Sequence, residues 1–171
     1  GLGENTTDVQ NYLNLTVNAL ADDKTPLVTD RAKAEIILAA LGVDSTRLTP
    51  LNGTEYSNAA KLAAMDLGSS HYAAPWVLLA EQAGQVKLTD AQRDSMIALL
   101  TDNLGADGLF VTKWGGETYA DPDTPGTALA ALAAYNTESY PQVQQFISRA
   151  VNGLSQAQRS NGSFGNVNSD A

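Results

Sequence analysis

Helical segments without charged residues most strongly constrain how this 171-residue chain can fold. The segments 73–80 (AAPWVLLA) and 125–135 (PGTALAALAAY) contain no Asp, Glu, Lys or Arg. The segment 34–41 (AEIILAAL) contains one charged residue, Glu35. A helix without a polar face is stable only when neighbouring elements cover it on all sides. We therefore expect these three helices to be buried all round.

Amphipathic segments alternate with the charge-free ones. In 90–104 and 141–158 the apolar side chains fall on one helical stripe and most charged side chains fall elsewhere. Such helices bury one face and expose the other. The alternation predicts two layers, an inner ring of buried helices inside an outer ring of half-exposed ones. The expected helices are 8–21, 30–42, 57–68, 72–84, 89–104, 124–135 and 141–158, and the glycines expected to end helices are Gly42, Gly68, Gly84 and Gly105.

An internal repeat supports the layered arrangement. The sequences ADGLF and NGSFG each follow an amphipathic helix, and their glycines, Gly108 and Gly162, are 54 residues apart. The same offset aligns Phe110 with Phe164. Repeats of this size cannot bury their apolar faces alone and therefore stack on neighbours. The expected repeating unit is one helical hairpin.

The segment 149–164 (RAVNGLSQAQRSNGSF) resembles the glutamine-and-tryptophan repeat of squalene and terpenoid cyclases and protein prenyltransferases. Gln158, Gly162 and Phe164 stand at the positions of the glutamine, the glycine and the aromatic residue, with Phe164 where tryptophan is usual. The resemblance implies an all-α fold, an α/α toroid, in which Gln158 bonds the next turn, Gly162 permits a tight reversal and Phe164 fills the gap between hairpins. It implies one toroid domain over 1–171, a partial or half ring that belongs to a longer chain.

The last fifty residues also resemble the helical domain of the cobalamin carriers, intrinsic factor and transcobalamin, and of related bacterial surface proteins. The string FGNV (164–167), followed by Ser169, carries the likeness most strongly. In these carriers the N-terminal ends of buried helices face a central cavity that holds the corrin. The carriers have disulfides, whereas this chain has no cysteine. The residues that the resemblance places at the cavity mouth are Asp123, Thr124, Asn166 and Asn168.

Aromatic residues precede this proposed mouth. Trp114 and Tyr119 lie in a Gly-containing loop that leads to Asp121. An aromatic loop over a cavity can hold a flat ligand, and the alternative is a loop anchored by its own aromatic side chains. His71, the single histidine, precedes a buried helix. It either faces the same cavity or serves as a capping or packing residue.

The sequence Asp121-Pro122-Asp123-Thr124 is similar to the acid motif of class II cyclases, where paired carboxylates share a proton. Neither alignment fits, because one puts Pro122 at the proton donor and the other lacks the following aspartate. The alternative is an N-cap with a proline in the first helical turn, and we favour it.

Metal sites are incomplete in the sequence. DPDTPG (121–126) matches only the first half of a calcium loop, since Pro125 takes the fifth position and Leu132 the twelfth, where a bidentate glutamate belongs. The prenyltransferase zinc site needs a cysteine, which the chain lacks. We therefore expect no metal cofactor, and the resemblance alone suggests a cobalamin-like ligand.

Charge limits the expected partners. The chain has a net charge of −9 and a pI near 4.3, so nucleic acid and anionic membranes would repel it electrostatically. No apolar run approaches the ~20 residues that span a bilayer. The lack of cysteine and the acidic, Thr/Asn-rich composition favour an extracellular or cell-surface location. At 160–171, where a further inner helix is expected to begin, we expect a homodimer contact or a contact with a missing C-terminal region.

We therefore predict a non-catalytic module of a bacterial cell-surface or secreted protein that binds a small-molecule ligand. Two alternatives stay open. A complete acid motif and an aromatic-lined cavity would favour a terpenoid- or squalene-cyclase-like enzyme. A ring centre filled by Ala and Leu would favour a purely structural or adhesive repeat domain.

Overall fold

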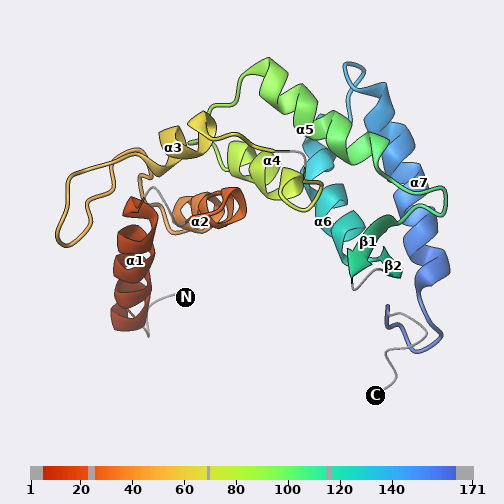
Figure 1. Cartoon of the computed structure of the whole chain (residues 1–171), viewed down its shortest axis with the longest axis horizontal. Coiled ribbons are helices and arrows are strands. Elements are labelled where there is room, and N and C mark those ends of the chain that lie inside the picture. Colours follow the sequence, from red (N-terminus) through yellow and green to blue (C-terminus); the bar gives the residue numbers. More distant parts are fainter. Residues whose placement is uncertain (1–5, 23–25, 69, 115–116, 165–171) are drawn as a thin grey trace. The chain divides into compact units, whose positions relative to one another are not determined.

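Helices dominate the structure, a computed structural model that describes residues 6–22, 26–68, 70–114 and 117–164 (Figure 1). All seven helices expected from the sequence are present, and α3 ends four residues earlier than predicted. The helices are α1 (Thr6–Ala21), α2 (Val28–Ala40), α3 (Asn58–Ala64), α4 (Ala74–Gln82), α5 (Asp90–Asp102), α6 (Asp123–Leu132), the 3-10 helix η1 (Ala133–Tyr135) and α7 (Pro141–Ala157).

A β-hairpin corrects the expectation of a loop before α6. The strands β1 (Phe110–Trp114) and β2 (Glu117–Asp121) pair antiparallel, with Phe110 opposite Asp121. The sequence contains the signal for this hairpin, since aromatic and β-branched residues flank Gly115-Gly116. The fold is thus predominantly helical with one small sheet.

The contacts divide the chain into two compact units. Unit 1 comprises Gly1–Leu67 and Leu79–Thr89, and unit 2 comprises Gly68–Leu78 and Asp90–Ala171. The boundary falls within α4, which contributes its first residues to unit 2 and its last residues to unit 1.

The core of unit 1 forms where α2 packs on α3. Leu38 and Leu62 are fully buried there. The same interior also holds Arg31, Glu35 and Asn58, which are 3%, 1% and 0% exposed. Buried charged groups must be paired or hydrogen-bonded, so this core depends on a polar network as well as on apolar packing.

The core of unit 2 forms between α5, α6, α7 and the hairpin. Helix α7 contacts both α5 and α6, and Figure 1 shows these three helices side by side. Phe110 at the start of β1 is fully buried, and its ring centroid lies 6.1 Å from that of Phe146 on α7. The hairpin is thereby anchored to the helical layer at the end nearest α6.

Burial differs between the helices in the expected order. Five of the ten residues of α6 are buried, against four of the seventeen residues of α7. The expectation that the segments 34–41, 73–80 and 125–135 are buried all round is wrong, because Ile37 on α2 and Ala130 on α6 are exposed. An exposed alanine adds little apolar surface, so an alanine-lined face can stay in water.

No helix within the described part of the chain has both the length and the apolar character needed to cross a bilayer.

Candidate functional site

The turn between α5 and β1 has a compact backbone held by three hydrogen bonds. The N–H of Gly105 donates to the carbonyl of Leu109 at 2.8 Å, and the N–H of Gly108 donates to the carbonyl of Gly105 at 3.0 Å. The carboxylate of Asp107 accepts from the N–H of Leu109 at 3.0 Å. Gly108 has φ +81°, a conformation that residues with a Cβ rarely adopt.

The turn after α7 repeats this arrangement bond for bond. The N–H of Arg159 donates to the carbonyl of Ser163 at 2.9 Å, and the N–H of Gly162 donates to the carbonyl of Arg159 at 2.9 Å. The side chain of Asn161 accepts from the N–H of Ser163 at 3.0 Å. Gly162 has φ +85°. Each residue stands 54 positions after its counterpart, so the repeat predicted from the sequence is confirmed at this turn.

The side chains that stabilise the two turns differ. In the second turn, Gln158 Nε2 donates to the carbonyl of Gly162 at 3.0 Å, as the repeat resemblance implies. The equivalent residue of the first turn, Leu104, cannot donate a hydrogen bond from its side chain. Instead, Arg149 on α7 donates to the carbonyls of Leu104 and Gly105 at 3.1 and 2.7 Å. The first turn is therefore held by a side chain of α7.

The surroundings of the two turns also differ. A Cβ on Gly108 would lie 2.2 Å from the carbonyl oxygen of Arg149, whereas a Cβ on Gly162 would meet no described atom within 4 Å. Phe110 is fully buried, but Phe164 is 44% exposed. The expectation that Phe164 fills a gap between hairpins is wrong here, because among the described residues no helix covers the second turn as α7 covers the first.

The N-terminus of α6 carries two of the predicted ligand-binding residues. The carboxylate of Asp121 accepts from the backbone N–H groups of Asp123 and Thr124 at 2.9 and 3.2 Å. It also accepts from the Thr124 hydroxyl at 2.6 Å. Asp121 therefore caps the helix, in agreement with the capping interpretation. Thr124 is buried, and Asp123 is exposed to solvent.

The hairpin carries two further predicted residues. Tyr119 on β2 is half-buried and donates its hydroxyl to the carboxylate of Glu117, and this hydrogen bond raises the pKa of Tyr119. Trp114 ends β1, where its backbone lies opposite Glu117. Tyr119 stands two residues before Asp121, whose carboxylate caps α6. The predicted residues Asn166 and Asn168 lie outside the described part of the chain.

His71 connects the segment before α4 to the hairpin. Its ring stacks on Phe110 with centroids 5.0 Å apart and touches Tyr72 at 4.3 Å. Its Nε2 is buried and has no hydrogen-bond partner within the described structure. Burial lowers the pKa of His71, although the charge of Asp121 acts in the opposite direction. The neutral ring therefore serves as a packing group, the alternative that the sequence left open.

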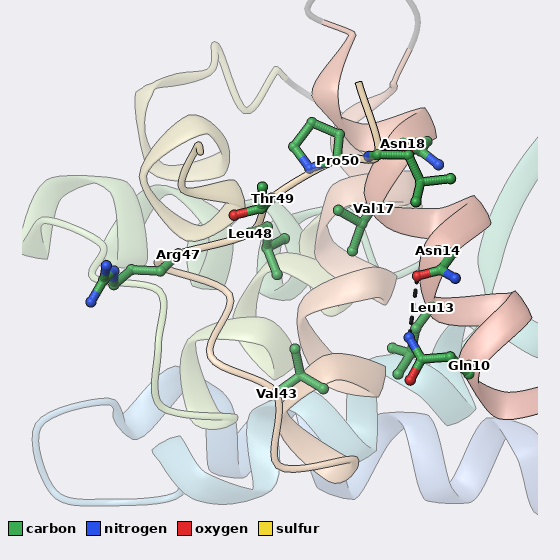
Figure 2. Close-up of a pocket in the computed structure, with 11 residues that line it drawn as sticks. Gln10, Leu13, Asn14, Val17, Asn18, Val43, Arg47, Leu48, Thr49 and Pro50 are labelled. Atoms are coloured by element: carbon green, nitrogen blue, oxygen red, sulfur yellow. Dashed lines mark hydrogen bonds between the residues drawn. The ribbon is translucent and has the colours of Figure 1, made fainter. Parts of the chain in front are cut away.

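A groove of about 420 Å³ lies in unit 1, and none of the predicted ligand-binding residues lines it (Figure 2). Amide side chains of α1 line one wall, where Gln10 Nε2 donates to Asn14 Oδ1 at 3.2 Å. The loop after α2 lines the other wall, and the N–H of Leu51 donates to Asn18 Oδ1 at 2.9 Å. The groove thus presents uncharged hydrogen-bonding groups, with Arg47 at its edge.

A buried polar network in unit 1 was missed by the sequence analysis. Arg31 Nη1 donates to Asn58 Oδ1 at 2.8 Å, and Asn58 Nδ2 donates to Glu35 Oε1 at 2.6 Å. The other oxygen of Glu35 accepts from the Ser45 hydroxyl at 2.6 Å. Burial raises the pKa of Glu35, while the hydrogen bonds from Ser45 and Asn58 oppose this shift.

The network stabilises the fold of unit 1. Arg31 also donates to the carbonyls of Leu20 and Asp22 at 2.9 and 3.0 Å, which attaches the end of α1 to α2. The side chains of Arg31, Glu35 and Asn58 are buried, and none of them lines the groove. The sequence signal was the pair of oppositely charged residues Arg31 and Glu35, which stand four positions apart on α2.

Groups of three or more His, Asp or Glu side chains that could hold a metal ion are absent from the described residues. Comparisons of the chain with protein-family models, with curated proteins and with solved structures found no match.

Proposed function

We propose that this chain is a non-catalytic binding module built from helical-hairpin repeats, arranged as part of an α/α toroid. The observation that carries this proposal is the turn at 105–109, which recurs at 159–163 with the same hydrogen bonds. Stacked hairpin repeats form extended surfaces that bind ligands or proteins. The acidic composition without cysteine favours a role in a secreted or cell-surface bacterial protein.

The burial pattern supports the two-layer arrangement. Helix α6 is the more buried of the last two helices, and α7 exposes its polar side. In this proposal α4 and α6 belong to the inner layer, and α5 and α7 belong to the outer layer. The proposal treats both units as parts of one repeat domain.

The proposed ligand site lies where the inner helices begin. Asp123 is exposed there, and Tyr119, four residues earlier on β2, is half-buried. Trp114, Thr124, Asn166 and Asn168 complete the set that the carrier resemblance supplies. The exposed carboxylate of Asp123 can accept hydrogen bonds from the amides of a corrin-like ligand, while an aromatic ring can contact its flat face.

Calorimetric titration with cobalamin and with cobinamide tests the ligand. We expect binding by the wild-type chain and by Glu138→Ala, an exposed charge-matched control on another loop. We expect Asp123→Ala to weaken binding. Binding that is unchanged in Asp123→Ala would place the site elsewhere, and no binding by any of the three proteins would refute a corrin ligand for this chain.

A purely structural or adhesive repeat is the second candidate function. It is favoured by the internal use of the polar groups near α6, since Asp121 caps the helix and Tyr119 bonds Glu117. This candidate predicts no small-molecule binding and predicts association through the turn at 159–163. Analytical ultracentrifugation over a range of concentrations distinguishes it, because a monomer at all concentrations would contradict self-association.

A further inference from the structure

Three Asn-Gly dipeptides occur in the sequence, at 52–53, 152–153 and 161–162. Asparagine followed by glycine deamidates spontaneously when the glycine nitrogen can reach the side-chain carbonyl carbon of the asparagine. The reaction needs a free backbone N–H and a chain that can rotate into the attacking geometry. A folded protein can therefore protect some dipeptides and leave others reactive.

The fold protects two of the three dipeptides. Asn152-Gly153 lies inside α7, and Gly153 is buried against the turn at Gly108. At Asn161-Gly162 the attacking N–H donates to the carbonyl of Arg159 at 2.9 Å. The Asn161 side chain is also held away, because its oxygen accepts from the N–H and the hydroxyl of Ser163 at 3.0 and 2.8 Å.

Asn52-Gly53 lies in a different environment. It occupies the exposed loop between Leu48 and Tyr56, whose backbones pair through two hydrogen bonds of 2.8 Å. Both residues of the dipeptide are exposed. Within the described part of the chain, the N–H of Gly53 makes no hydrogen bond, and neither does the Asn52 side chain.

We propose that Asn52 is a site of spontaneous deamidation, which the fold selects from these three dipeptides. The Gly53 nitrogen loses its proton to solvent and attacks the Asn52 side-chain carbonyl carbon, forming a carbon–nitrogen bond. The bond from that carbon to Nδ2 breaks, and ammonia leaves. Water then opens the cyclic imide at either carbonyl, which yields aspartate or isoaspartate.

The modification changes the loop beside the groove of Figure 2. It adds a carboxylate to the loop between Arg47 and Glu55, which form an exposed ion pair at 3.3 Å. Isoaspartate also lengthens the main chain directly after Leu51. The N–H of Leu51 donates a hydrogen bond to Asn18 Oδ1, and both residues line the groove. Any ligand of the groove therefore meets a more negative and reshaped loop after modification.

Peptide mass spectrometry after incubation of the folded chain in mildly alkaline buffer tests the proposal. Trypsin separates the three dipeptides, because it cleaves after Arg47, Lys61, Arg149 and Arg159. We expect Asn52 to deamidate about 100-fold faster than Asn161, the factor that three ordinary hydrogen bonds contribute together. Asn58, in the same tryptic peptide as Asn52 and fully buried, serves as an internal control.

Two controls separate the effect of the fold from that of the sequence. In concentrated urea the protecting hydrogen bonds are lost, so all three dipeptides should react at similar rates. Asn52→Gln should abolish the early mass change, because glutamine cyclises slowly. Equal rates at Asn52 and Asn161 in the folded chain, or an unchanged mass shift in Asn52→Gln, would overturn the proposal.

Discussion

The substitution Asn58→Asp tests the buried network of unit 1 with almost no change in volume. Asn58 Nδ2 donates to Glu35 Oε1 at 2.6 Å and to the carbonyl of Arg31 at 3.3 Å. An aspartate replaces this donor with an acceptor, while its other oxygen still accepts from Arg31. Two carboxyl oxygens would then face each other within a buried interior.

The expected loss follows from the burial of these groups. Removing one partner from a buried charged network costs about 3–5 kcal/mol, and like charges at this distance cannot both ionise. One carboxyl group of the pair therefore keeps its proton in the folded state. The unfolded chain releases that proton near its ordinary carboxyl pKa of about 4. The free energy of unfolding of Asn58→Asp should consequently fall as the pH rises above this value.

The free energy of unfolding of the wild-type chain should also fall as the pH rises, but less steeply than that of the variant. The pKa of Glu35 is raised above 4.5 in the folded state, chiefly by burial. A group that binds its proton more tightly when folded stabilises the fold less as the pH rises through its titration range. The variant should therefore differ least from wild type at low pH.

Urea unfolding followed by circular dichroism at about pH 5 and about pH 7 measures the effect. Asn136→Asp, an exposed asparagine in unit 2, is the matched control and should unfold as the wild type does. A loss below about 1 kcal/mol for Asn58→Asp near pH 7 would refute the reasoning, since that is the size of an ordinary substitution. A loss that is independent of pH would show that the two carboxyl groups do not interact.

Three further predictions concern unit 2. Gly162→Ala should lower the free energy of unfolding by about 1 kcal/mol, because Gly162 has a positive φ. Gly108→Ala should lower it further, because the added Cβ would also clash with the carbonyl of Arg149. Equal urea midpoints for the two variants would contradict this difference in packing. Arg149→Met keeps the aliphatic part of the side chain but loses the hydrogen bonds to the carbonyls of Leu104 and Gly105. The melting temperature should therefore fall by an amount equivalent to about 1–2 kcal/mol. An unchanged melting temperature would argue against a role of Arg149 in holding the first turn. The pKa of His71 lies below 6.5 in the folded state, so the free energy of unfolding should fall as the pH decreases below that value. His71→Phe should remove part of this acid sensitivity in melting experiments. A melting temperature that depends on pH in the same way in the variant and in the wild type would disprove this prediction.

Local signals predicted most of the helical structure. The charge-free runs, the apolar stripes and Pro141 located the helices, and the 54-residue spacing of Gly108 and Gly162 located the two turns. These features depend on residues close together in the sequence. The signal for the hairpin is equally local, since Gly115-Gly116 separates two strand-like runs, and the expectation of a loop there is wrong.

Features that depend on distant residues could not be predicted in the same way. Asn58 joins Arg31 and Glu35 only after α3 has packed on α2, across 27 and 23 residues of sequence. Phe110 and Phe164 have the same local sequence position but different exposure, because burial depends on which helix packs against each turn.

The proposed function requires that the segment ending at Phe164 be one hairpin unit that can accept another. The most direct measurement is the melting temperature and helical circular dichroism of a chain in which a second copy of residues 111–164 follows Phe164. The copied Arg149 and Gly153 should pack on the turn at 159–163, so we predict added helical signal and a higher melting temperature. Valine in place of the copied Gly153 should abolish the gain, because a Cβ at Gly153 lies 2.4 Å from the carbonyl of Asp107. The repeat would be contradicted if the appended copy added no helical signal. It would also be contradicted if the copy raised the melting temperature equally with valine in place of the copied Gly153.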